Sequence, residues 1–249
     1  MATRGTPMIH ARIVHDGAVL DARVEGDVVV AGALRLPVAQ ATFAPPCTPT
    51  KIVCVGFNYR DHAAELAWEP PREPLLFLKP PSALVGHEAP IPYPAHTRQL
   101  EYEAELAVVI GRRCRQVPRA RALDVVWGYT AFNDITARDV QREERQWVRA
   151  KAFDGAAPLG PWIVTDLDPG ALDIAARVNG KTTQASNTRH MIFDVPTLIE
   201  VVSSFMTLEP GDVIATGTPA GVGPLQPGDV VEVEIGGIGV LRNRVVTGQ

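Results

Sequence analysis

The chain has 249 residues, of which 46% are hydrophobic, and its formal net charge is −4. This length and composition provide a sizeable core and exclude a largely disordered protein. Positive charge forms no stripe along the sequence, so we expect no nucleic-acid partner. Apolar runs fall well short of the roughly 20 residues of a membrane helix, and the first ten residues carry no apolar signal region. We therefore expect a cytoplasmic protein with no membrane partner.

The numbers and spacing of cysteine, histidine, proline and glycine limit the possible fold classes and the kinds of metal site. The three cysteines are widely spaced, and the six histidines form no His-Glu-x-x-His pair. These features argue against a disulfide framework and against a zinc site. Proline and glycine are plentiful, with 22 and 21 residues, and they imply many turns between short strands. The composition therefore favours a β-rich fold over a helical bundle.

The first part of the chain has the pattern of a small β unit that leads into a larger domain. Residues 8–30 contain strand-like runs joined at Asp16 and Gly17. The stretch that follows is rich in proline and alanine, which is typical of a linker. We therefore predict an accessory β-domain and its linker at residues 1–49, and a main domain at residues 50–249.

Within the main domain, short strands alternate with a few helices. We expect strands at 51–56, 75–79, 100–111, 127–134, 161–166, 172–178, 181–186 and 212–216, and a closing hairpin at 229–246. We expect helices at 57–67, 118–126, 136–151 and 194–206. Asp194 should cap the last helix, whose predicted core stripe consists of Val195, Leu198, Ile199, Val202, Phe205 and Met206.

The predicted strand at 100–111 carries the strongest chemical signal. Side chains alternate across a strand, so Glu101, Glu103 and Glu105 share one face at spacings of about 7 Å. Two carboxylates at that spacing repel by roughly 2 kcal/mol, and a hard cation such as Mg²⁺, Mn²⁺ or Ca²⁺ would relieve the repulsion. The alternative is a solvated acidic edge strand without a metal. Asp134, at the end of another strand, is either a helix cap or a further ligand.

Two other segments carry groups that could take part in chemistry. His62 and Glu65 are three residues apart on a predicted helix, so they share one face. A carboxylate beside an imidazole allows the pair to move protons, although ordinary surface pairs have the same spacing. The charged helix at 136–151 is either a solvated surface, especially at 142–145, or a lid beside a site. Lys151 at its end can reach inward as a cation.

The segment 217–224, GTPAGVGP, has only a superficial likeness to a phosphate-binding loop. It lacks the Gly-Lys-Ser/Thr ending and the Gly-x-Gly-x-x-Gly spacing. Pro224 and Pro227 also disfavour the helix that such a loop needs. We therefore predict no nucleotide site, although a glycine-rich turn still lets a ligand approach backbone amides.

Several long segments together resemble the fumarylacetoacetate hydrolase family. They extend from about residue 50 to about residue 245 and include GFNYRDHAAEL, EPLLFLKP, LEYEAELAVVIG, GYTAFNDITARDVQ, RAKAFDGAAPLGPW and NTRHMIFDVPTLIEVVSSFMTLEPGDVIATGTPAGVG. The resemblance implies a mostly β (α+β) fold, which is a mixed β-roll of several sheets with short peripheral helices. It makes the main domain the catalytic domain, with the small N-terminal β unit beside it. It also suggests a homodimer.

The same resemblance implies roles for individual residues. The implied ligands of Mg²⁺ or Mn²⁺ are Glu103, Glu105 and Asp134, and Glu101 is left outside the metal site. The implied catalytic residues are His62, Glu65 and Lys151, of which the His–Glu pair handles water in hydrolytic relatives. The implied substrate-binding residues are Arg138, Gln141 and Thr218.

The implied substrate is a small 2-oxo acid that reacts through a metal-bound enolate. Decarboxylation, isomerisation and hydrolysis share that enolate, so family membership does not fix the reaction. Segments 61–86 and 100–111 resemble the decarboxylase/isomerase of homoprotocatechuate (4-hydroxyphenylacetate) breakdown, which acts on unsaturated 2-oxo dicarboxylic acids. Segment 135–151 is more similar to the acylpyruvate hydrolase and oxaloacetate decarboxylase branch.

We expect the decarboxylase/isomerase activity. The alternatives are hydrolysis of an acylpyruvate or fumarylpyruvate, and decarboxylation of oxaloacetate. A non-enzymatic alternative is an inactive metal-binding scaffold, but the joint presence of His62, Glu65, Lys151 and the three implied metal ligands argues against it.

Overall fold

The computed structural model describes residues 6–65, 69 and 71–248. The strands of the first half are β1 (Ile9–His15), β2 (Ala18–Glu25), β3 (Val28–Ala31), β4 (Leu34–Pro37), β5 (Thr42–Ala44), β6 (Ile52–Gly56), β7 (Leu75–Lys79), β8 (Leu84–Val85), β9 (Pro90–Tyr93), β10 (Leu100–Tyr102) and β11 (Ala104–Ile110). Those of the second half are β12 (Val126–Asn133), β13 (Thr136–Ala137), β14 (Ala157–Val164), β15 (Asp173–Val178), β16 (Lys181–Asn187), β17 (Val213–Ala215), β18 (Gly223–Leu225), β19 (Val230–Ile235) and β20 (Gly239–Thr247).

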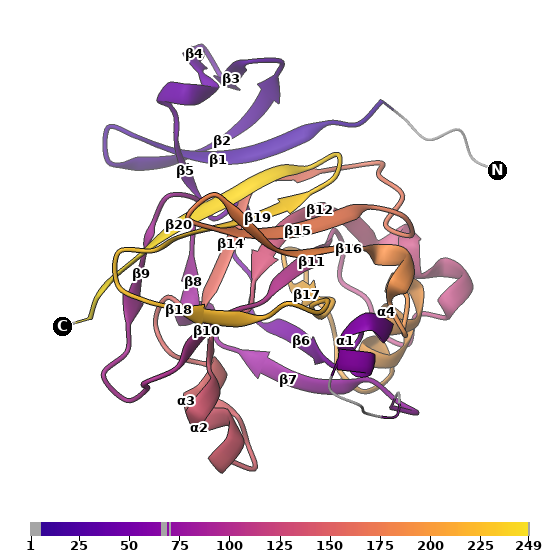
Figure 1. Cartoon of the computed structure of the whole chain (residues 1–249). Coiled ribbons are helices and arrows are strands. Elements are labelled where there is room, and N and C mark those ends of the chain that lie inside the picture. The colour runs from indigo at the N-terminus through magenta and orange to yellow at the C-terminus, as the bar shows by residue number, and fades with distance from the viewer. Residues whose placement is uncertain (1–5, 66–68, 70, 249) are drawn as a thin grey trace.

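The helices are short and lie outside the sheets (Figure 1). The α-helices are α1 (Arg60–Glu65), α2 (Arg138–Glu143), α3 (Val148–Lys151) and α4 (Val195–Phe205). Single 3₁₀ turns or short 3₁₀ helices occur at Val38–Gln40, Pro81–Ala83, Arg119–Val125 and Thr188–His190. The last residues of the helix predicted at 57–67 lie outside the described residues. None of the helices described is long and apolar enough to cross a membrane.

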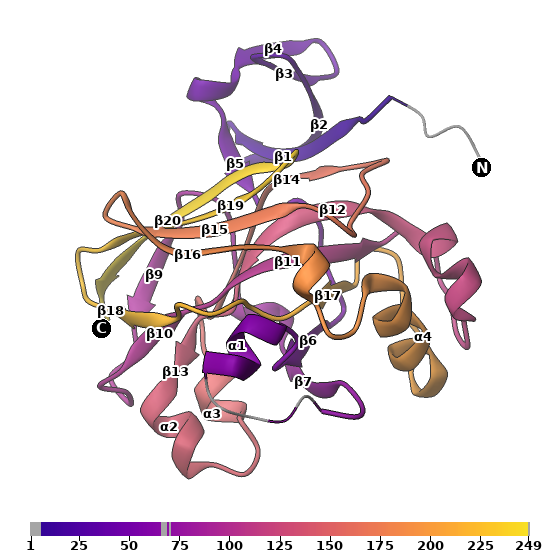
Figure 2. The ribbon, with the colours of Figure 1, turned by 45° about the vertical axis from the view of Figure 1, so that its right-hand side comes forward.

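The described strands form three sheets. The largest has twelve strands in the order β4-β3-β2-β1-β14-β12-β11-β17-β6-β7, with β5 beside β1 and β8 beside β14. The two smaller sheets have the orders β13-β10-β18 and β16-β15-β19-β20-β9. Figure 2 shows these layers stacked, with the helices α1 to α4 at their margins. This arrangement confirms the predicted mostly β fold of several sheets with peripheral helices.

Strands β1 to β5 form the N-terminal unit at the top of Figure 1. Their own small core contains Ile13, Val29 and Phe43, while β1 pairs antiparallel with β14 and so extends the largest sheet. The expectation of a mere linker after residue 30 is wrong, because β4 pairs with β3 and β5 pairs with β1. The division into domains at residues 1–49 and 50–249 stays a prediction.

The strand predicted at 100–111 is in fact two strands, separated at Glu103. β10 pairs with β13 and β18, whereas β11 pairs with β12 and β17 in the largest sheet. At the break, the Glu103 N–H donates to Asn133 Oδ1 at 3.0 Å, and its carbonyl accepts from the Asp134 N–H at 2.9 Å. The chain therefore changes sheet among the predicted metal ligands.

The single helix predicted at 136–151 is also wrong, because the chain forms α2 and α3 with a break at residues 144–147. Trp147 lies at this break and packs edge-on against Phe57 and Phe77, with ring centroids 6.5 and 5.5 Å away. This packing of distant segments explains the break, which the local charge pattern does not reveal. It also turns Lys151 inward, where its side chain is 2% exposed.

Helix α4 confirms the helix predicted at 194–206. The side chain of Asp194 caps it by accepting from the Thr197 N–H at 3.0 Å. The buried residues of the stripe are Val195, Leu198, Ile199 and Val202. Phe205 was expected in the core but is 53% exposed, because the helix ends there and the ring lies beyond the buried stripe.

Candidate metal centre and substrate cleft

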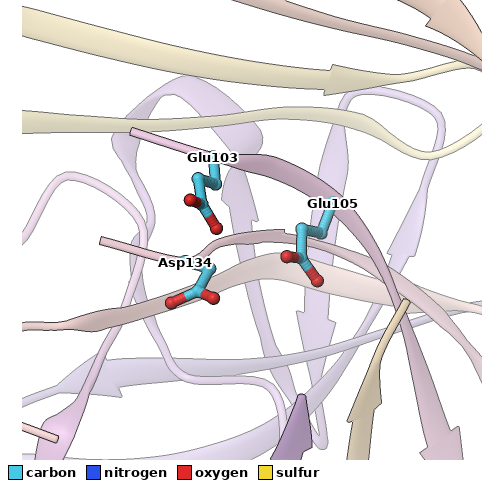
Figure 3. Close-up of side chains that lie close together, drawn as sticks. All are labelled: Glu103, Glu105 and Asp134. Atoms are coloured by element: carbon cyan, nitrogen blue, oxygen red, sulfur yellow. The ribbon is translucent and has the colours of Figure 1, made fainter. Parts of the chain in front are cut away.

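Three buried carboxylates converge where β10, β11 and β12 meet. Glu103 lies between β10 and β11, Glu105 lies on β11, and Asp134 directly follows β12. One carboxylate oxygen from each residue lies within 4.8 Å of the others (Figure 3). Antiparallel pairing of β11 with β12 sets Ala104 opposite Asn133, and this register brings Asp134 beside Glu103. The structure thus brings together the three residues predicted to bind a metal.

Two cations of the chain hold Glu103. Lys151 Nζ donates to Glu103 Oε2 at 2.9 Å and to Asp134 Oδ2 at 2.7 Å. Arg138 donates to the other oxygen of Glu103, and its Nε donates to Glu101 Oε2 at 2.6 Å. Burial alone would raise the pKa of Glu103, but Lys151 and Arg138 together hold this pKa below its usual value. Glu101 pairs with Arg138 and lies outside the carboxylate cluster.

Glu105 has a different environment from Glu103. Burial, and then the nearby charges of Asp134 and Glu103, raise the pKa of Glu105 well above its usual value. The Gly217 N–H donates to its Oε2 at 2.8 Å. Gly217 has a φ of +90°, and a Cβ there would lie 2.8 Å from the Cβ of Asn58. Glycine therefore allows this turn to lie close to the segment that follows β6, while its N–H contacts Glu105.

Lys79, at the end of β7, is a buried cation to which the sequence analysis gave no role. Its Nζ donates to the carbonyls of Ile135 (3.0 Å), Lys151 (2.6 Å) and Ala156 (2.8 Å). An ammonium has three protons, so its further contact with Asp134 Oδ1, at 2.8 Å, is electrostatic. Asp134 Oδ1 is therefore buried without a hydrogen-bond donor. The sequence feature that could have identified Lys79 is its position at the end of the apolar strand LLFLK.

The donor atoms of this cluster fit a hard divalent cation. Asp134 and Glu103 raise the pKa of the buried Glu105, so a further cation among the three carboxylates would relieve their mutual repulsion. Carboxylate oxygens are the ligands that Mg²⁺ and Mn²⁺ prefer, whereas zinc sites usually contain histidine or cysteine. Glu103, Glu105 and Asp134 would hold Mg²⁺ or Mn²⁺ here.

A cleft of about 640 Å³ leads toward this cluster. Its lining residues are Phe57, His62, Glu65, Glu101, Arg138, Gln141, Arg142, Trp147 and Val222. A small recess shares several of these residues and is also lined by Glu103, Lys151 and Thr218, so it continues the cleft inward to the carboxylates. His62 Nδ1 and Glu65 Oε2 lie 3.0 Å apart on the cleft wall. Of the sequence-predicted site residues, the cleft and its recess are lined by His62, Glu65, Glu103, Arg138, Gln141, Lys151 and Thr218.

Hydrogen bonds constrain the residues predicted to bind substrate. Gln141 Oε1 accepts from Arg138, so the amide nitrogen is the group that Gln141 can offer to a ligand. Thr218 Oγ1 accepts from Gln184 Nε2 at 2.9 Å. Gln184 Oε1 in turn accepts from the Ala104 N–H at 3.0 Å and so ties the glycine-rich turn to β11. Gln184 is not among the predicted site residues, because a lone glutamine in the polar strand KTTQAS gives no signal of burial.

The chain belongs to the fumarylacetoacetate hydrolase family. Residues 51–246 match the family model for the C-terminal region of fumarylacetoacetate (FAA) hydrolase. A protein of Archaeoglobus fulgidus is 52% identical over 94% of this chain and 95% of its own length. The 4-hydroxyphenylacetate degradation bifunctional isomerase/decarboxylase of Salmonella dublin is 45% identical over 82% of this chain and 49% of its own length. Mitochondrial oxaloacetate tautomerase of Bos taurus is 45% identical over 85% of this chain and 71% of its own length.

Solved structures of the family share the whole fold. 5-Carboxymethyl-2-hydroxymuconate delta-isomerase from Mycobacterium smegmatis is 44% identical with a TM-score of 0.91, over 97% of this chain and 100% of that chain. 2-Hydroxyhepta-2,4-diene-1,7-dioate isomerase from Mycobacterium marinum is 41% identical with a TM-score of 0.88, over 96% of this chain and 98% of that chain. Maleylpyruvate hydrolase from Sphingobium, in complex with manganese(II) and pyruvate, is 34% identical with a TM-score of 0.84. The match covers 97% of this chain and 100% of that chain.

Proposed function

We propose that this protein is a divalent-metal-dependent enzyme that decarboxylates or isomerises 2-oxo dicarboxylic acids of the kind formed in 4-hydroxyphenylacetate breakdown. The observation that carries the proposal is the cluster of Glu103, Glu105 and Asp134 at the inner end of a cleft. Mg²⁺ or Mn²⁺ bound there supplies a Lewis acid that stabilises negative charge on the oxygen of an enolate. Isomerases of this pathway are among the structural neighbours, and one neighbour contains manganese and pyruvate.

Lys151 adds a second positive charge beside the place where the enolate forms. Its Nζ touches both Glu103 and Asp134, and it also lines the recess. Burial would lower the pKa of Lys151, but Asp134 and Glu103 raise it above its usual value, so the side chain remains an ammonium. A fixed ammonium stabilises developing negative charge without reorganisation.

His62 and Glu65 are the proton-transfer pair of the proposal. Glu65 orients the imidazole through its 3.0 Å contact with Nδ1, which leaves Nε2 to exchange a proton with water. Phe57 stacks on His62 with ring centroids 6.2 Å apart, and Trp147 closes the same wall. These aromatic rings form an apolar part of the cleft lining beside His62.

Hydrolysis is the second candidate function. The His62–Glu65 pair has the geometry to activate a water for cleavage of an acylpyruvate or fumarylpyruvate, and maleylpyruvate hydrolase is a structural neighbour. Oxaloacetate decarboxylation is a related alternative, since one relative acts on oxaloacetate. An inactive metal-binding scaffold has no need for Lys151, His62 and Glu65 around the same cleft.

A substrate panel with Mg²⁺ tests these functions against one another. The panel contains oxaloacetate, acetylpyruvate, fumarylpyruvate and the ring-cleavage acids of homoprotocatechuate. Release of CO₂, release of pyruvate and the shift of the ultraviolet spectrum separate decarboxylation, hydrolysis and isomerisation. We expect the highest kcat/KM for decarboxylation or isomerisation of the ring-cleavage acids. No turnover of any compound would support the inactive scaffold.

The proposal also includes a homodimer in the cytoplasm whose ligand is a small 2-oxo acid. The net charge of −4 and the absence of a basic stripe in the sequence support a small-molecule ligand over nucleic acid. Family resemblance supports the dimer. Light scattering during gel filtration tests it by giving the mass of the assembly, for which the monomer contributes 26.8 kDa.

A further inference from the structure

A continuous series of polar contacts runs from the carboxylate cluster to the outer wall of the cleft. Arg138 joins Glu103 to Glu101. Gln99 Nε2 donates to Glu101 Oε1 at 2.6 Å, and Gln99 Oε1 accepts from Arg142 Nη1 at 3.0 Å. Arg142 is therefore the outer end of a wall whose inner end is Glu103. Arg142 is exposed, as the prediction of a solvated surface at residues 142–145 implies, and it also lines the cleft.

The two arginines of this wall differ in their charge balance. Arg138 forms ion pairs with both Glu101 and Glu103. Arg142, within the part of the chain that the structure describes, contacts the neutral amide oxygen of Gln99 and no carboxylate. The positive charge of Arg142 is therefore available to an anionic ligand, whereas that of Arg138 is already compensated.

The rest of the cleft does not compensate this charge. Besides Glu101, the carboxylate that lines the cleft is Glu65, and it has His62 as its own basic partner. Phe57, Trp147 and Val222 supply apolar lining that suits a hydrocarbon spacer. A ligand that carries an anionic group on a hydrocarbon spacer matches both the positive charge of Arg142 and the apolar lining of the cleft.

We propose that Arg142 binds the second carboxylate of a 2-oxo dicarboxylic acid and thereby selects dicarboxylic over monocarboxylic substrates. This inference rests on the proposed function, which puts the 2-oxo carboxylate end at the metal cluster. Arg142 follows Arg138 by four residues on α2, which is about 6 Å farther along the helix axis. Because Arg138 contacts Glu103, an extended acid bound at the cluster directs its distal carboxylate along this wall to Arg142. The guanidinium fork suits bidentate binding of that carboxylate.

Calorimetric titration in Mg²⁺ tests the inference without requiring turnover. The two probes are 2-oxohexanedioate and 2-oxohexanoate, which have the same chain length and differ in the distal carboxylate. We expect the native protein to prefer the diacid by about tenfold or more, as one charge-assisted contact predicts. Arg142→Gln should reduce this preference to about twofold or less, and Arg142→Lys should retain part of it.

Arg145→Gln is the matched control, since it removes the same charge from the same segment. Arg145 is exposed and lies outside the lining of the cleft, so this variant should keep the preference of the native protein. An unchanged preference in Arg142→Gln, with melting temperature also unchanged, would overturn the role of Arg142. If the native protein binds neither acid, the proposed function itself fails, and the inference fails with it.

Discussion

Lys79 Nζ lies 2.8 Å from Asp134 Oδ1, yet it gives its three protons to the carbonyls of Ile135, Lys151 and Ala156. Lys79 therefore compensates part of the buried negative charge of Asp134. Burial lowers the pKa of Lys79, and the charge of Asp134 opposes this effect. The same ammonium joins three separate segments behind the site.

Replacement of Lys79 should be strongly destabilising. Lys79→Met leaves Asp134 and three carbonyls without their buried cation, and loss of one partner of a buried pair costs about 3–5 kcal/mol. Urea unfolding followed by circular dichroism measures the change. Lys181→Met, at an exposed position of β16, is the control and should change the unfolding free energy by less than about 0.5 kcal/mol.

A double variant separates the ion pair from the carbonyl bonds. Lys79→Met with Asp134→Asn removes both charges, so its cost should be at least about 1 kcal/mol smaller than the sum of the two single changes. Additive costs would mean that Lys79 stabilises the fold through the three carbonyls alone.

His62→Ala should affect hydrolysis and enolisation differently. Removal of a positioned proton-transfer group typically costs about 10²–10⁴-fold in rate. We expect a loss in this range for hydrolysis of acetylpyruvate and a much smaller loss for enolisation of the same compound. Pyruvate release and deuterium exchange at the carbon next to the 2-oxo group measure the two rates. Equal losses would show that His62 and Glu65 are not a water-activating pair.

Asp212 should make folding stability depend on acid pH. Burial would raise the pKa of Asp212, but the Glu209 amide, Lys51 and Thr50 hold it below its usual value. A depressed folded-state pKa stabilises the fold above the unfolded-state pKa of about 4, and this contribution is lost as pH falls through the folded-state pKa. Urea unfolding at a series of pH values should show native stability declining below about pH 4.

Asp212→Asn should flatten that decline and lower stability at pH 7 by about 2–4 kcal/mol, because the carboxylate accepts several buried bonds. Asp168→Asn, a change of an exposed carboxylate, is the control. A pH profile of Asp212→Asn with the same slope as that of the native protein would contradict this role.

Chelation should abolish turnover. We expect activity on the best substrate of the panel to disappear after treatment with EDTA and dialysis, and to return with Mg²⁺ or Mn²⁺, since the three carboxylates then regain their ion. Circular dichroism controls for loss of fold. Full activity in protein shown by elemental analysis to be metal-free would refute the proposed chemistry.

Local sequence patterns predicted much of the site. Alternation along a strand put Glu103 and Glu105 on one face, and family motifs added Asp134, which the structure brings within 4.8 Å of both. Helical spacing paired His62 with Glu65, whose side chains are 3.0 Å apart. The His62–Glu65 pair depends on a short stretch whose geometry is set by one helix, whereas the approach of Asp134 to Glu103 depends on the register of β11 with β12.

Features that depend on distant segments could not be predicted in this way. The break at Glu103 arises because β10 and β11 find different partner strands. The break before Lys151 accompanies packing of Trp147 on Phe77. The burial of Lys79 requires carbonyls from residues more than fifty positions away. Local periodicity carries no information about such contacts.

The most direct test of the metal centre is a calorimetric titration of metal-free protein with Mn²⁺. The titration compares the native chain with the Glu105→Gln variant. The change keeps the shape of the side chain and removes one of three mutually repelling carboxylates. The metal-free variant should therefore unfold at the same or a higher urea concentration than the native chain, while its Mn²⁺ affinity falls by about 100-fold or more. Equal Mn²⁺ affinity in the two proteins, or no binding to the native chain, would contradict a metal site built from Glu103, Glu105 and Asp134.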